Sequence, residues 1–161
     1  MGSPADPLAT ALEDEHRRID EAIAAYVASA APREPQHLLD AVALLRTHIY
    51  VEEVFLFPAL QGSGTELMAP VFVMLREHGQ LWQTLDDLVI ELRLGDPDDA
   101  AALGLCRKLE VALLHHNGKE EQIFYSQIGT LLAPQIRDRV LRALTDADLP
   151  DGWVPRRATR T

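Results

Sequence analysis

The sequence predicts an all-α fold: an antiparallel up-down-up-down four-helix bundle with a short C-terminal fifth helix. Three observations predict it. Apolar residues recur every three or four positions through long segments, clusters of Pro and Gly separate these segments, and no segment alternates as a strand does. With 161 residues, of which 47% are hydrophobic, the chain is long enough for one substantial core. We expect the bundle to span residues 1–149 and a flexible tail to span residues 150–161.

The first helix is expected over residues 6–30, and the prolines of the APREPQ segment make its continuation costly. The second is expected over residues 36–60 and ends at the glycines of QGSGT. Pro70 suits the first turn of a third helix, which GDPDD separates from the fourth. The fourth is predicted from about residue 98 to beyond residue 128, and Pro134 separates it from a short fifth helix over residues 135–144.

Composition and charge exclude several functional classes. The formal net charge of −10 argues against a nucleic-acid partner, because no basic face is present. No run of 18 apolar residues predicts a membrane span, and the N-terminal residues do not resemble a signal peptide. A single cysteine, Cys106, excludes an internal disulfide and a cysteine-rich metal site. We therefore expect a cytoplasmic protein.

Polar side chains interrupt the apolar stripe of every long helix. His16 and His78 each occupy a position where the stripe of the first or third helix predicts an apolar residue. In the second helix the stripe includes His48 and Glu52, and in the fourth it includes His116 and Glu120. Residues four apart lie about 40° from each other around an α-helix, so each His-xxx-Glu pair points inward together.

These motifs belong to an internal repeat. DEHRRIDEA aligns with REHGQLWQT, and HIYVEEVFLFP aligns with HNGKEEQIFYS. The repeated unit is a helical hairpin that carries one His on its first helix and His-xxx-Glu on its second. The four histidines also lie at similar distances from the predicted loops, so an antiparallel bundle brings them to one level.

Four imidazoles and two carboxylates at one level of an apolar core predict a cation site. A buried carboxylate without a partner is strongly disfavoured, and two that face each other are more so. Six nitrogen and oxygen ligands exceed what one zinc ion needs, and they suit two metals bridged by carboxylates.

The order His, His-xxx-Glu-Glu, Glu-His, His-xxx-Glu-Glu resembles the hemerythrin-like (HHE) cation-binding domains. The resemblance covers about residues 15–125. It implies a four-helix bundle that holds two non-haem Fe ions, bridged by an oxo or hydroxo species and two carboxylates. By motif matching it implies six ligands: His16, His48, Glu52, His78, His116 and Glu120.

The chain departs from the oxygen-carrying hemerythrins at one point. Those proteins have two histidines four apart on the third helix, whereas here Met74 and Trp82 lie four residues from His78. The resemblance therefore implies that one iron lacks an imidazole or takes a substitute such as Tyr125, His115 or water. A more open pair of irons suits chemistry with peroxide (H2O2) or nitric oxide (NO), or redox and iron sensing, with which the family is also associated.

Several neighbouring residues are further candidates. Glu53 and Glu121 point about 100° away from the ligand glutamates and are solvated or hold a ligating imidazole in orientation. Tyr125 lies about 140° from Glu120 on an α-helical wheel. His115 is expected beside the site rather than in it, because the register of the motif favours His116. Trp82 and Met74 are candidates for the wall of a pocket.

Four hypotheses follow for the function. The first is a di-iron protein that binds dioxygen (O2) or a related small oxidant. The second is an enzyme at the same site, either catalase-like or acting on NO. The third is an iron or redox sensor, and the fourth is a metal-free structural bundle. Histidine and carboxylate ligands also suit Zn and Mn, so the pattern does not select iron by affinity. The oligomeric state is not indicated.

Overall fold

The computed structural model describes residues 4–159, which contain helices and no strand. The all-α prediction is thus confirmed over this part of the chain. The first long helix is α1 (Pro7–Ala28). Its N-terminus is capped by Asp6, whose carboxylate accepts the backbone N–H groups of Leu8 (2.9 Å) and Ala9 (3.4 Å). The same carboxylate pairs with Arg137 and so ties the start of α1 to the last helix.

The second helical segment is not a uniform α-helix, as the sequence pattern had suggested. It consists of α2 (Gln36–Val51), a π-helical turn η1 (Glu52–Leu56) and α3 (Phe57–Gln61). The third helix is α4 (Met68–Leu94), and it ends where Gly95 adopts a left-handed conformation with φ of 65°.

The fourth helical segment repeats the interruption of the second. It consists of α5 (Ala100–Lys119), a π-helical turn η2 (Glu120–Phe124), a 3-10 turn η3 (Tyr125–Gln127) and α6 (Ile128–Leu131). The prediction of one continuous α-helix is therefore wrong at η2, as it is at η1. A short helix α7 (Pro134–Asp146) follows, close to its predicted bounds.

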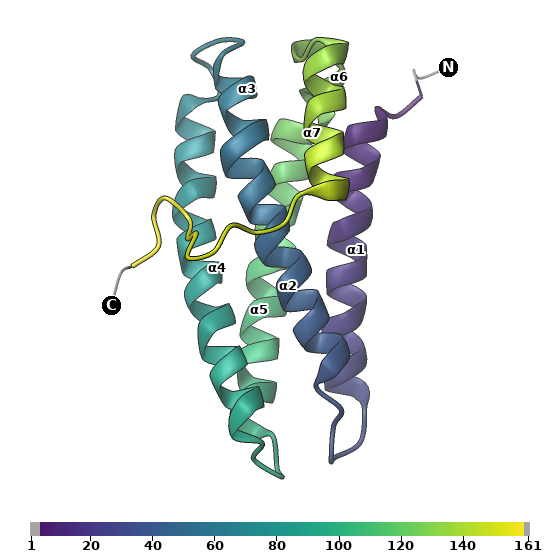
Figure 1. Cartoon of the computed structure of the whole chain (residues 1–161), viewed down its shortest axis with the longest axis vertical. Helices are drawn as coiled ribbons and strands as arrows, with labels where there is room; N and C mark the ends of the chain where they lie inside the picture. Colours follow the sequence, from purple (N-terminus) through teal and green to yellow (C-terminus); the bar gives the residue numbers. More distant parts are fainter. Residues whose placement is uncertain (1–3, 160–161) are drawn as a thin grey trace.

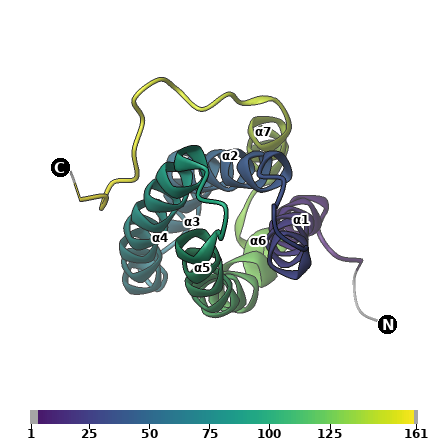
Figure 2. The same cartoon turned by 90° about the horizontal axis from the view of Figure 1, so that it is seen from below.

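The long helices lie side by side, and the chain reverses direction at alternate ends of the molecule (Figure 1). Seen along the helices, α1 contacts α2 and α5, and α4 contacts the same two helices (Figure 2). The core is divided into two apolar clusters. One contains Leu12, Leu60 and Phe124, and the other contains Ile23, Leu85 and Leu109. The predicted metal ligands belong to neither apolar cluster, although they are equally buried.

The segment that follows α7 crosses the outer side of α2 and α4 (Figures 1 and 2). Trp153 packs edge-on against Tyr50 and Trp82, and Pro155 is buried. The sequence pattern gave no indication of this packing. None of the described helices is long and apolar enough to cross a membrane.

Candidate metal centre

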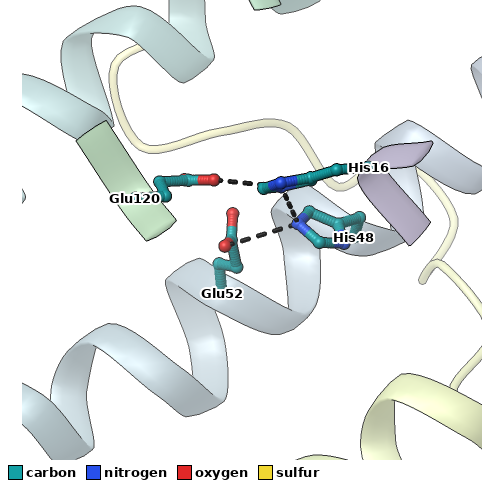
Figure 3. A group of neighbouring side chains, drawn as sticks. All are labelled: His16, His48, Glu52 and Glu120. Carbon is teal, nitrogen blue, oxygen red and sulfur yellow. Dashed lines mark hydrogen bonds and ion pairs between the residues drawn. The ribbon is translucent and has the colours of Figure 1, made fainter. Parts of the chain in front are cut away.

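Side chains from every long helical segment converge at the middle of the bundle. Two groups of potential ligand atoms form there. Within each group, all of the atoms lie within 4.8 Å of one another. We call them the first half-site (His16, His48, Glu52 and Glu120; Figure 3) and the second half-site (Glu52, His78, His116 and Glu120). The structure therefore brings together all six residues that the sequence predicts.

In the first half-site the two imidazoles face each other through their Nε2 atoms. The Nε2 atoms of His16 and His48 are 3.1 Å apart. Glu120 Oε2 lies 3.2 Å from His16 Nε2, and Glu52 Oε1 lies 3.4 Å from His48 Nε2. Two nitrogens bound to one metal at right angles, each about 2.1 Å from it, would lie about 3 Å apart. The spacing of the donor atoms therefore suits a shared cation.

The second half-site has the same composition. Glu52 Oε2 lies 3.3 Å from His78 Nε2, and Glu120 Oε1 lies 3.4 Å from the same atom. His116 Nε2 is 2.9 Å from Glu120 Oε1. Each of the two carboxylates thus directs one oxygen to each half-site. A carboxylate in this position can bridge two cations.

Each imidazole is oriented by a second carboxylate on its outer side. Four pairs join a histidine Nδ1 atom to a carboxylate oxygen: His16–Glu121 (3.0 Å), His48–Glu15 (2.7 Å), His78–Glu53 (2.9 Å) and His116–Glu77 (2.8 Å). Because a carboxylate only accepts, every Nδ1 donates and every Nε2 is free to face the centre. Such outer carboxylates are the usual partners of metal-binding histidines.

The outer carboxylates follow the internal repeat. Glu53 and Glu121 directly follow the two glutamates shared by the half-sites, and the sequence had suggested this role for them. Glu15 and Glu77 directly precede His16 and His78, yet each supports the histidine of the adjacent helix. Sequence reasoning missed this pair. The Glu-His dipeptide, present in both repeats, was the signal that could have found it.

The π-helical turns begin at the shared glutamates, Glu52 and Glu120. In η1 the N–H of Phe57 donates to the carbonyl of Glu52, and in η2 the N–H of Tyr125 donates to that of Glu120. An i→i+5 bond places the fifth residue nearly above the first, so both aromatic rings turn inward. Phe57 stacks on His78 with centroids 5.6 Å apart, and Tyr125 stacks on His16 with centroids 5.4 Å apart.

Tyr125 is fully buried and its hydroxyl lies among the donor atoms of the first half-site. It donates to Glu52 Oε1 at 2.5 Å and lies 3.2 Å from Glu120 Oε2. It is also 3.2 Å from the Nε2 atoms of both His16 and His48. The α-helical wheel placed this residue on the wrong face, because the extra residue of the π-helical turn rotates it inward.

The charges of the site are strongly coupled. Burial lowers the pKa of His48, but the carboxylates of Glu52 and Glu15 outweigh it and raise the pKa to about 10. The same competition raises the pKa of His78 well above its usual range. Burial favours the neutral form of Glu120, yet the surrounding imidazoles, above all His116, hold its pKa well below the usual range. Without a cation, these pKa shifts favour pairing of the His48 and His78 imidazolium groups with the neighbouring carboxylates.

Three buried atoms test whether these residues fit a cation. Glu52 Oε2, His78 Nε2 and Glu120 Oε1 form no well-directed hydrogen bond, although they lie at ion-pair distance from neighbouring groups of the site. All three point into the second half-site, and buried polar atoms without partners are costly. A cation bound there would satisfy all of them, so the donor set fits a metal.

Three further residues that the sequence suggested for the site lie outside both half-sites. His115 is exposed and belongs to neither half-site, so it is not a substitute ligand in this arrangement. Trp82 contacts Trp153 and carries the Arg46 guanidinium 5.1 Å above its ring. Met74 is buried in the apolar cluster that contains Phe57 and Phe124. The predicted pocket wall at Trp82 is thus a contact with the C-terminal segment.

A cavity of about 340 Å³ opens between α4 and α5 beside the second half-site. Its lining includes both members of the His116–Glu77 pair. The remaining lining residues are Gln80, Leu81, Thr84, Lys108, Ala112 and His115. The outer side of His116 therefore faces this opening.

Comparisons with known proteins agree with this geometry. A family model described as the hemerythrin HHE cation binding domain matches residues 8–128, which contain all six converging ligands. No curated protein and no solved structure matches the chain. Because the family model covers most of the sequence, the chain belongs to the hemerythrin HHE cation-binding domain family.

Proposed function

We propose that this chain forms an up-down-up-down four-helix bundle that holds two iron ions and binds dioxygen or a related small oxidant. One observation carries the proposal: two groups of four buried donors share both of their carboxylates. Glu52 and Glu120 would bridge the ions, and two histidines would bind each ion. A pair of irons supplies redox electrons and coordination positions for a small oxidant.

Tyr125 is proposed as the substitute for the imidazole that the third helix lacks. Its hydroxyl lies 3.2 Å from the Nε2 atoms of His16 and His48, nearly as close as the 3.1 Å between those two atoms. Burial and the two nearby carboxylates raise the pKa of Tyr125 well above its usual range, so the phenol holds its proton and donates it to Glu52. A cation in the first half-site would displace that proton and take the phenolate as a ligand.

Metal content tests the proposal directly. Protein purified without chelator or added metal should contain close to two irons per chain. Stripping the metal should lower the free energy of unfolding, by about 3 kcal/mol for each ion relative to protein in free metal at a hundred times the Kd. A chain that holds no metal and has the same stability in chelator would instead be a metal-free structural bundle.

An enzyme that decomposes hydrogen peroxide or acts on nitric oxide is the second candidate. Two observations favour it: the unpartnered atoms of the second half-site and the cavity that reaches its His116. Ala112 is an exposed residue in the wall of that cavity. Ala112→Trp would fill the opening without replacing a ligand, and it should reduce peroxide turnover while iron content stays constant.

Ala101→Trp is the matched control, since Ala101 is exposed on the same helix and does not line that cavity. Equal turnover in the two variants would mean that peroxide does not enter through this cavity. The absence of steady turnover in the iron-loaded protein would favour the oxidant-binding function over the enzyme.

A further inference from the structure

The C-terminal strap, residues 150–158, contacts one of the outer carboxylates. The backbone N–H of Arg156 donates to Glu53 Oε2 at 2.9 Å. The other oxygen of Glu53 accepts from His78 Nδ1 at 2.9 Å. A continuous chain of hydrogen bonds therefore leads from the strap backbone through Glu53 to an imidazole of the second half-site.

The strap is held in place by several independent contacts. Trp153 lies with ring centroids 5.1 Å from Tyr50 and 5.6 Å from Trp82, both edge-on. The Arg157 guanidinium lies 4.6 Å from the centre of the Phe72 ring. Aromatic and cation–π contacts of this kind each add modest stability. Together they dock the strap across α2 and α4.

Gly79 is the point where the strap approaches α4 most closely. A Cβ at this position would lie 2.8 Å from the carbonyl carbon of Arg157 and closer still to its oxygen. Only glycine allows a backbone to approach in this way. The position that matches Gly79 in the first repeat is Arg17, whose side chain is exposed and carries no such contact. Glycine is thus found in the repeat against which the strap packs and not at the matching position of the other repeat.

The strap also makes the two repeats unequal at the metal centre. The Glu53 side chain is 5% exposed. Its counterpart Glu121, which supports His16, is 40% exposed. Among the hydrogen bonds of the described residues, Glu53 is the outer carboxylate that a segment outside the bundle holds.

We propose that the C-terminal strap is a positioning element for the second half-site. Its Arg156 amide fixes Glu53, and Glu53 in turn fixes the His78 imidazole with Nε2 toward the cation. The metal in the second half-site is therefore retained through the strap, whereas the metal in the first is not. This inference rests on the proposed function, because it assigns the strap a role at the same two-metal centre.

The test uses the full chain with Gly79→Ala, whose methyl group would displace the strap. Gly104→Ala is the matched control, because it is also a helical glycine and a Cβ there meets nothing within 4 Å. Hydrogen exchange on metal-free protein should show the Arg156 amide protected in the wild type and in the control. In Gly79→Ala we expect exchange at this amide to be at least tenfold faster.

Iron release to a chelator provides the second readout. Disturbing an outer ligand typically weakens metal binding by about 10- to 100-fold. In Gly79→Ala one of two irons should leave at least about tenfold faster than in the control. The visible absorption of an iron–tyrosinate pair should remain, since Tyr125 lies in the first half-site. Trp153→Ala, which loosens the strap from its own side, should behave in the same way.

Several results would overturn the proposal. An unprotected Arg156 amide in the wild type would show that the strap does not dock. Release of both irons at control rates would show that docking has no effect at the centre. Equal acceleration of both irons would indicate general destabilisation. A wild type that binds no iron would instead refute the proposed function itself, and with it the strap's role toward a metal.

Discussion

The two half-sites are built from repeated residues, yet they differ in one aromatic side chain. In the first half-site the ring that follows the π-helical turn is Tyr125, and its hydroxyl contacts four donor groups. In the second it is Phe57, which stacks on His78 and offers no polar atom. The three atoms of the site without a well-directed hydrogen bond all lie on the Phe57 side: Glu52 Oε2, His78 Nε2 and Glu120 Oε1.

This difference shows how duplication can produce an unequal pair of sites. The Tyr125 hydroxyl contacts the donor atoms of the first half-site, whereas Phe57 offers no hydroxyl to the second. Under the proposed function, the Tyr125 phenol on the fourth helical segment would make the ligation of the two half-sites unequal. The half that opens toward the cavity is the one without that phenol.

The largest effect is expected from a change that acts on both halves. Glu120→Gln removes the charge of a carboxylate that contacts His16, His78 and His116. Because this carboxylate serves both half-sites, we expect metal affinity to fall by more than about 100-fold for both ions. Metal titration followed by calorimetry would measure it. Retention of one tightly bound ion would mean that the halves are independent.

Exchanging the aromatic residues sharpens the comparison. Tyr125→Phe makes the first half-site resemble the second, and it leaves Glu52 Oε1 without its short hydrogen bond. We expect a loss of about 1–3 kcal/mol in the unfolding free energy of the metal-free protein and loss of the tyrosinate–iron absorption. Denaturant titration and visible spectra would report both.

Phe57→Tyr is the reciprocal variant and places a hydroxyl beside His78. It should gain a second tyrosinate signal if the two halves differ only in this residue. A spectrum unchanged from that of the parent would show that η1 does not direct position 57 toward the metal.

A smaller effect is expected at the outer carboxylates. Glu53→Gln should weaken metal binding at the second half-site by about tenfold, because the amide supports His78 less strongly than a carboxylate does. Glu121→Gln should act on the first half-site and by less, since this residue is 40% exposed and water can replace it. Competition with a chelator would rank the two variants. The opposite ranking would contradict the asymmetry described above.

The effect expected to develop most gradually is the change in unfolding free energy with pH in the metal-free protein. The folded-state pKa of His48 is raised to about 10 from an ordinary value of 6.5. Such a group contributes stability that is complete below pH 6.5 and is lost as the pH rises through 10. Unfolding free energy measured between pH 7 and 10 should therefore fall in the metal-free protein. A flat profile would show that His48 is neutral when folded.

Much of the fold and the centre could be predicted from the sequence. Helical periodicity located the helices, and the polar interruptions of that periodicity identified His48, Glu52, His116 and Glu120. The buried positions of these residues could be located because burial requires an apolar stripe, so a polar residue on the stripe is conspicuous. Glu15 and Glu77 could also have been found, since a repeated Glu-His dipeptide places a carboxylate beside a neighbouring helix.

Other features could not be read in this way. An α-helical wheel assumes 3.6 residues per turn, so a π-helical turn displaces every residue beyond it. That assumption misplaced Tyr125. The strap escaped prediction for a different reason. Residues 150–158 have no periodicity, and their position depends on contacts with Glu53, Gly79 and Trp82 that are distant in sequence.

The two π-helical turns also limit where the chain can change in length. Deleting one residue from η1 or η2 would restore α-helical geometry and rotate everything beyond it by about 100°. Phe57 or Tyr125 would then leave the centre, although every ligand before the deletion would stay in place. The connections at residues 62–67 and 95–99 have no such constraint, because added residues there cost only a small loop-closure entropy. Insertions and deletions should therefore be tolerated at the ends of the bundle and excluded at its two innermost turns.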